Sequence, residues 1–112
     1  MASTLKPEQK VRKEVLAYLR KQGHAVFPID TRSRVTTRGI YATFNPDYGT
    51  KGCADLLVFS KSSTISPLWM ELKKPGKRRI DGDQVLFREK VLALGHEYVV
   101  VNRVEDCRKL GL

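Results

Sequence analysis

Two acidic side chains and a lysine lie beside or within runs of apolar residues. Asp55 lies in the apolar segment Gly52–Phe59, and Glu71 and Lys73 interrupt a second one, Leu68–Pro75. Because side chains alternate between the two faces of a strand, Glu71 and Lys73 should point the same way. A buried carboxylate or ammonium group costs free energy unless it is paired or binds a ligand. Two acids and a lysine at one place predict the chemistry of a metal-dependent phosphodiesterase.

The bulk composition limits the classes of protein to consider. The chain has 112 residues and 41% hydrophobic residues, which favours a single globular domain over residues 1–112. Its net charge of +9 favours polyanionic partners, with nucleic acid first and an anionic membrane surface second. No apolar run is long enough to span a bilayer, and none resembles a signal peptide. Cys53 and Cys107 lack metal-site spacing and predict two reduced thiols in an intracellular protein.

Periodicity and turn residues predict an α/β fold in which helices flank a mixed sheet. The helix between the Glu71 strand and the last strand is a crossover, so those two strands should be parallel. The segment Asp30–Arg38 is predicted to be a polar loop. The expected order is α-β-β-β-β-α-β-α, with a helix at 5–22, strands at 24–29, 39–44, 52–59 and 68–75, a helix at 81–94, a strand at 97–101 and a helix at 104–110.

Two further polar residues have alternative interpretations. Glu8 falls near the centre of the apolar face of the first helix, where it either stabilises the first turn through the helix dipole or reaches the acidic cluster. Gln84 stands three residues after Asp81, which is the spacing of a capping box. Gln84 also shares a helix face with Phe87 and Val91, which would turn it toward the strands. Both roles of Gln84 are compatible.

Together these segments resemble the PD-(D/E)XK nuclease superfamily, and more narrowly the VRR-NUC (virus-type replication-repair nuclease) family with its small stand-alone phage and bacterial members. The resemblance covers nearly the whole chain. It rests on Glu8, Gly52–Asp55, Glu71–Pro75, Gln84 and Gly95. The proline that names the superfamily motif is replaced by Ala54, a substitution that the family pattern permits.

The resemblance implies a restriction-endonuclease-like core and a role for each matching residue. Asp55 and Glu71 resemble the metal-binding carboxylates, assisted by the backbone carbonyl of Leu72. Lys73 resembles the catalytic lysine beside the attacking water, and Glu8 and Gln84 resemble residues that support the metal and the site. The implied metal is Mg²⁺, with Mn²⁺ accepted, which suits two carboxylates and a carbonyl because Mg²⁺ prefers hard oxygen ligands.

The implied activity is endonucleolytic hydrolysis of DNA, selective for branched, flapped or nicked structures, by a cytoplasmic homodimer in a bacterial or phage-infected cell. A further replication or repair partner is a second expectation. A non-catalytic basic nucleic-acid-binding module, or a nuclease active only with a partner, are the alternatives. None of the basic residues obviously reads a base, so contacts to the phosphate backbone are expected. The candidates for these contacts are Arg32, Arg34, Arg38, Lys51, Lys74, Lys77, Arg78 and Arg79.

Overall fold

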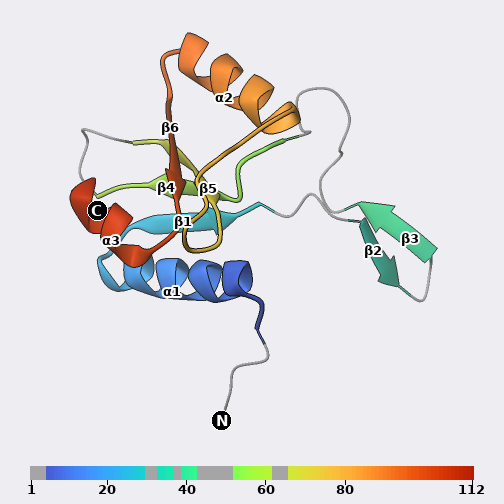
Figure 1. Ribbon diagram of the computed structural model, residues 1–112, viewed down its shortest axis with the longest axis horizontal. Helices are drawn as coiled ribbons and strands as arrows, with labels where there is room; N and C mark the ends of the chain where they lie inside the picture. The colour runs from blue at the N-terminus through green and yellow to red at the C-terminus, as the bar shows by residue number, and fades with distance from the viewer. Residues whose placement is uncertain (1–4, 30–32, 37–38, 43–51, 62–65) are drawn as a thin grey trace.

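A computed structural model describes residues 5–29, 33–36, 39–42, 52–61 and 66–112, with 33–36 and 39–42 described by their backbone (Figure 1). Arg32, Arg38 and Lys51, and the predicted strand end at 43–44, lie outside these residues. Within the described part of the chain, no helix has the length and apolar character needed to cross a membrane.

Four strands form one mixed sheet in the order β1–β4–β5–β6. They are β1 (Ala25–Pro28), β4 (Leu56–Phe59), β5 (Leu68–Leu72) and β6 (Glu97–Val101). β4 pairs antiparallel with both β1 and β5, whereas β5 and β6 are parallel. Helix α2 (Asp83–Ala93) makes the crossover between β5 and β6, so the predicted parallel pair is confirmed. The predicted mixed sheet flanked by helices is confirmed as well.

Helices cover both faces of this sheet (Figure 1). Helix α1 (Pro7–Lys21) and the short helix α3 (Val104–Lys109) pack on one face and contact each other. α1 begins with a proline in its first turn, where the missing N–H costs no hydrogen bond. Its buried residues are spaced four apart and face the sheet. The main core between these layers contains Val11, Val15, Leu19, Val26, Leu56, Val58, Leu68, Met70, Leu72, Val101, Cys107 and Leu112.

Helix α2 covers the opposite face with a smaller core. Phe87 and Val91 of α2 are buried with Ala54, as the predicted inward face of this helix requires. Trp69 and Tyr98 come from the sheet and pack against this group. Glu71, the polar residue of β5, therefore lies on the face that α2 covers.

Three sequence-based expectations need correction. Asp30–Arg38 contains a strand, β2 (Ser33–Thr36), which pairs antiparallel with β3 (Gly39–Ala42) in a separate two-stranded sheet (Figure 1). Backbone pairing and β-branched residues suffice for such a ribbon, so polarity misled the prediction. β6 lies at a sheet edge and buries only its last residue fully, although its apolar run predicted a buried strand.

The third correction concerns the start of β4, which was expected at Gly52 and occurs at Leu56. Asp55 precedes the strand because its side chain, not its backbone, bonds to the neighbouring β5: Asp55 Oδ2 accepts a hydrogen bond from the N–H of Leu72 at 2.8 Å. The backbone carbonyl of Asp55 accepts a hydrogen bond from Ile29 N–H at 2.8 Å. This delayed start of β4 leaves the Asp55 carboxylate directed at β5.

Gly52 fixes the position of α2 relative to the sheet. Its φ of +74° lies in the left-handed region, and a Cβ atom here would come within 2.2 Å of the backbone carbonyl of Asp83. Only a glycine therefore lets the chain before Asp55 pass so close to the first turn of α2. This contact sets where Gln84, the next residue of the helix, can reach.

We predict that Gly52→Ala destabilises the protein more than Gly76→Ala. Both glycines have a positive φ, but a Cβ at Gly76 meets nothing within 4 Å. The left-handed backbone should cost each variant on the order of 1 kcal/mol. The clash with α2 should add about 1–3 kcal/mol at Gly52 alone. Urea unfolding of both variants measures the difference, and equal losses would contradict the close contact.

Candidate active site

The carboxylates of Asp55 and Glu71 come together because of the register between β4 and β5. Leu57 pairs with Trp69, so the same antiparallel register continued by two residues brings Asp55 opposite Glu71. The N–H of Leu72 points toward Asp55 and donates to its Oδ2. Since the N–H and C=O of a strand residue point to the same neighbour in such a pair, the Leu72 carbonyl also lies on the Asp55 side.

Glu71 is held in an environment that opposes its ionisation. Its exposure is 3%, and burial, followed by the charge of Asp55, raises the pKa of Glu71 from 4.5 to about 9. The charge of Lys73 acts in the opposite direction but does not outweigh these effects. Glu71 Oε2 is buried and has no hydrogen-bond partner among the described residues. The two acids therefore lie in one site where the negative charge of Asp55 opposes the ionisation of Glu71.

Gln84 connects Glu71 to Lys73. Its Nε2 donates a hydrogen bond to Glu71 Oε1 at 3.2 Å, and its Oε1 accepts one from Lys73 Nζ at 3.0 Å. The capping box with Asp81 is not formed: α2 has Gly82 at its N-cap and no side-chain cap. Of the two interpretations of Gln84, the structure therefore supports the side chain that faces the strands. The backbone N–H of Lys73 bonds to the carbonyl of Val101 at 2.9 Å, which holds the lysine beside β6.

Glu8 lies in the exposed first turn of α1, whereas Glu71 is buried and Asp55 is half-buried. Its charge is the weakest of those that affect the pKa of Glu71. Within the described residues, no group of three or more His, Cys, Asp or Glu side chains is arranged to hold a metal ion. Glu8 therefore acts on the acidic pair through its charge and does not join it as a third close carboxylate. Its expected role in supporting a metal stays a prediction.

The residues at this site fit a hard divalent cation. Two carboxylates meet there, and one buried oxygen of Glu71 lacks a hydrogen bond. The carbonyl of Leu72 lies on the same side. An ion such as Mg²⁺ needs only one or two carboxylates from the protein and keeps several waters. Such an ion would compensate the repulsion that now favours a proton on Glu71.

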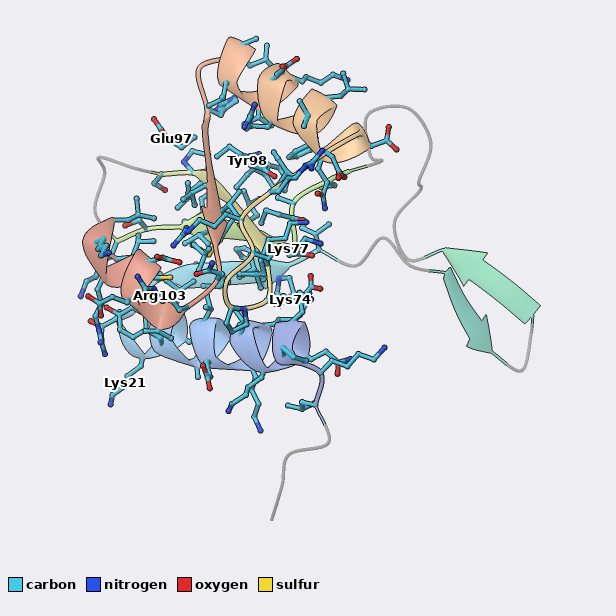
Figure 2. All side chains as sticks on the ribbon, in the orientation of Figure 1. Lys21, Lys74, Lys77, Glu97, Tyr98 and Arg103 are labelled. Atoms are coloured by element: carbon cyan, nitrogen blue, oxygen red, sulfur yellow. The ribbon has the colours of Figure 1, made fainter. Side chains whose placement is uncertain are left out.

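Several of the predicted backbone-binding residues lie close to the site in the chain. Lys74 and Lys77 are exposed on the connection from β5 to α2, directly after Lys73 (Figure 2). Arg79 is also exposed there. Arg34 belongs to β2, but its side chain lies outside the described residues, as do Arg32, Arg38 and Lys51. Nucleic-acid contacts by all of these residues stay predictions.

Arg78 has a structural task that the sequence did not reveal. Its guanidinium contacts Asp106 Oδ1 at 2.6 Å and donates to the carbonyl of Val100 at 3.3 Å. Asn102 joins the same network: its N–H donates to Asp106 Oδ2 at 3.0 Å, and its side chain donates to the carbonyl of Lys77 at 3.1 Å. These bonds tie the basic turn after β5 to the start of α3.

The ionised form of Asp106 is stabilised by this network. Burial opposes ionisation, but the hydrogen bonds from Asn102 and Arg78 and the charges of Arg78 and Arg103 lower its pKa below the ordinary value. The network therefore stabilises the folded protein at pH values above the ordinary pKa of an aspartate. This stabilisation is lost as the pH falls and Asp106 takes up a proton.

Two residues near the acidic pair were not selected from the sequence as functional. Tyr98 was read as one residue of an apolar strand, but it pairs in register with Trp69 on the face of the sheet that carries Glu71. The predicted parallel pairing of the last strand with the Glu71 strand could have placed Tyr98 near Glu71. Cys53 packs against the smaller core, and burial, Glu71 and Asp55 raise the pKa of its thiol to about 11. Cys53 therefore carries a protonated thiol, as expected for a packing residue.

Comparison with known proteins supports the fold. A solved structure described as "VRR_NUC domain" superposes with a TM-score of 0.66 over 95% of this chain and 95% of that one, at 21% sequence identity. No family model matches the sequence, and no curated protein matches it either. The chain thus has the fold of a VRR_NUC domain, as the sequence motifs led us to expect.

We predict that Glu71→Gln stabilises the metal-free protein increasingly as the pH rises. Between about pH 5 and pH 8, Glu71 is ionised in the unfolded chain but keeps its proton in the folded protein, because its folded pKa is about 9 and its ordinary pKa is 4.5. Unfolding in this range therefore releases a proton. Wild-type stability therefore falls over this range, whereas glutamine does not titrate. The advantage of Glu71→Gln should grow by on the order of 1–3 kcal/mol.

Urea unfolding in the presence of a chelator at several pH values measures this change. Glu14→Gln is the matched control because Glu14 is exposed on α1. An advantage of Glu71→Gln that does not vary with pH would contradict a protonated, buried Glu71.

Proposed function

We propose that this chain is a metal-dependent nuclease of the PD-(D/E)XK type and a member of the VRR-NUC family. The observation that carries the proposal is the chain of hydrogen bonds from Lys73 through Gln84 to Glu71, with Asp55 opposite. This arrangement holds an ammonium group beside a pair of carboxylates, and its charge offsets only part of their repulsion. The fold shared with a VRR_NUC domain supports the same conclusion.

The proposed reaction is hydrolysis of a phosphodiester, in which a water oxygen bonds to phosphorus and one P–O ester bond breaks. Mg²⁺ or Mn²⁺, when bound by Asp55, Glu71 and the Leu72 carbonyl, supplies a Lewis acid and lowers the pKa of water. Lys73 orients the attacking water and stabilises the negative charge that develops on the phosphate oxygens. Gln84 keeps the Lys73 ammonium in place. By analogy with the family, the products carry a 5′-phosphate and a 3′-hydroxyl.

DNA is the proposed substrate, and branched, flapped or nicked forms are the proposed targets. The net charge of +9 and the exposed basic turn after β5 support binding to a polyanion. We also propose a homodimer, a cytoplasmic location and a further replication or repair partner. A labelled panel of linear, nicked, flapped, four-way and single-stranded DNA, with an RNA duplex added, identifies the substrate.

Lys73→Ala should strongly slow metal-dependent cleavage while preserving DNA binding. Loss of one positioned donor for the transition-state charge should lower the cleavage rate about 10²–10³-fold. Cleavage of the panel with Mg²⁺ or Mn²⁺ measures the rate, and a mobility-shift assay measures binding. Lys74→Ala is the matched control because this neighbouring lysine is exposed and should retain the rate at saturating DNA.

The outcomes separate the proposed nuclease from its alternatives. Equal cleavage by Lys73→Ala and wild type would contradict the assignment of Lys73. A wild-type protein that binds DNA and cuts none of the panel with either metal would indicate a binding module. Cleavage that appears only with a helicase or another repair protein would indicate a partner-dependent subunit.

Arg79→Ala should weaken binding of all DNA sequences alike and change its dependence on salt. If Arg79 contacts one phosphate, its loss lowers the slope of log K against log salt by about 1. Arg78→Ala serves as the neighbouring control because it removes the partner of Asp106 and should lower stability below that of Arg79→Ala. Binding titrations at several salt concentrations and urea unfolding measure both effects. An unchanged slope for Arg79→Ala would exclude it as a phosphate contact.

A further inference from the structure

The hydroxyl of Tyr98 is buried without a hydrogen-bond partner among the described residues. Tyr98 lies between β6 and α2 (Figure 2), with its ring centroid 6.2 Å from that of Phe87. A phenylalanine would keep the same ring contact and avoid the cost of an unsatisfied hydroxyl. Packing therefore explains the ring of Tyr98 but not its oxygen.

Tyr98 pairs in register with Trp69, which precedes Glu71 by two residues on the same face of the sheet, so the acidic pair lies near this hydroxyl. Burial raises the pKa of Tyr98 above its ordinary value, and among the charges that raise it further, Glu71 contributes most and Asp55 next. The hydroxyl therefore stays protonated at neutral pH and can donate a hydrogen bond. Glu71 Oε2, on the same face of the sheet, is also buried without a hydrogen-bond partner among the described residues. Two buried polar oxygens thus lack partners in one region.

We propose that Tyr98 is a positioning residue for the acidic pair: one bridging water joins its hydroxyl to Glu71 Oε2. Gln84 already donates to the other oxygen of this carboxylate. Hydrogen bonds at both oxygens would fix the orientation of Glu71. Groups that orient a metal-binding carboxylate in this way raise its affinity for the metal. This consequence for metal binding rests on the proposed function, whereas the link between Tyr98 and Glu71 does not.

A double-mutant cycle in the presence of a chelator tests the link without any metal. Tyr98→Phe removes only the hydroxyl, and Glu71→Met removes both carboxylate oxygens at similar volume. If the two side chains interact, the changes in thermal midpoint should deviate from additivity by roughly 2 °C or more. Additive changes would overturn the proposal.

Calorimetric titration with Mg²⁺ tests the consequence for the site. Tyr98→Phe should bind Mg²⁺ roughly tenfold more weakly than wild type. Tyr18→Phe is the matched control: the Tyr18 hydroxyl donates to the carbonyl of Leu112 at 2.7 Å, so its loss should lower stability and leave the Mg²⁺ affinity unchanged. Equal affinities of Tyr98→Phe and wild type would overturn the positioning role. A wild type that binds no Mg²⁺ would instead contradict the proposed function, and the metal-free cycle would still decide whether Tyr98 and Glu71 interact.

Discussion

The repulsion between Asp55 and Glu71 is the constraint on which the site depends. A fold gains nothing from two acids that face each other across paired strands, and burial raises the pKa of Glu71 far above its ordinary value. The neighbouring lysine offsets only part of this cost, because its ammonium is bonded to Gln84 and not to either carboxylate. Such a pair is costly as structure and useful as a cation site, which is why we assign it a function.

The rest of the molecule holds this pair in place. The larger core under α1 and α3 supplies the stability, and the smaller core under α2 closes the face that carries the acids. Gly52 allows α2 to approach closely enough for Gln84 to bridge Glu71 and Lys73. On the other side of the connection after β5, Asp106 fixes the basic turn through Arg78. Glu71 and the exposed lysines after it thus belong to one continuous segment, which Gln84 holds at Glu71 and Lys73 and Asp106 holds at Arg78.

The sequence predicted those parts of the fold and site that local pattern controls. The alternation of side chains along β5 predicted that Glu71 and Lys73 lie on one face. The spacing of Gln84, Phe87 and Val91 along their helix predicted that Gln84 faces the strands. The sequence did not identify β2, because strand pairing in a two-stranded ribbon needs no apolar pattern. Tyr98 was missed because its role depends on which residue it meets across a parallel pair, and Glu8 proved more exposed than its place on the apolar stripe suggested.

The most direct test of this account is calorimetric titration of Mg²⁺ at about pH 7 in buffers of different ionisation enthalpy, which counts the protons released. If the ion binds between Asp55 and a protonated Glu71, wild type should release about one proton per ion. Asp55→Asn, which keeps the shape of the site but removes one ligand charge, should bind much more weakly. Binding without proton release, or equal binding by Asp55→Asn, would contradict the claim that this pair is the metal site of a nuclease.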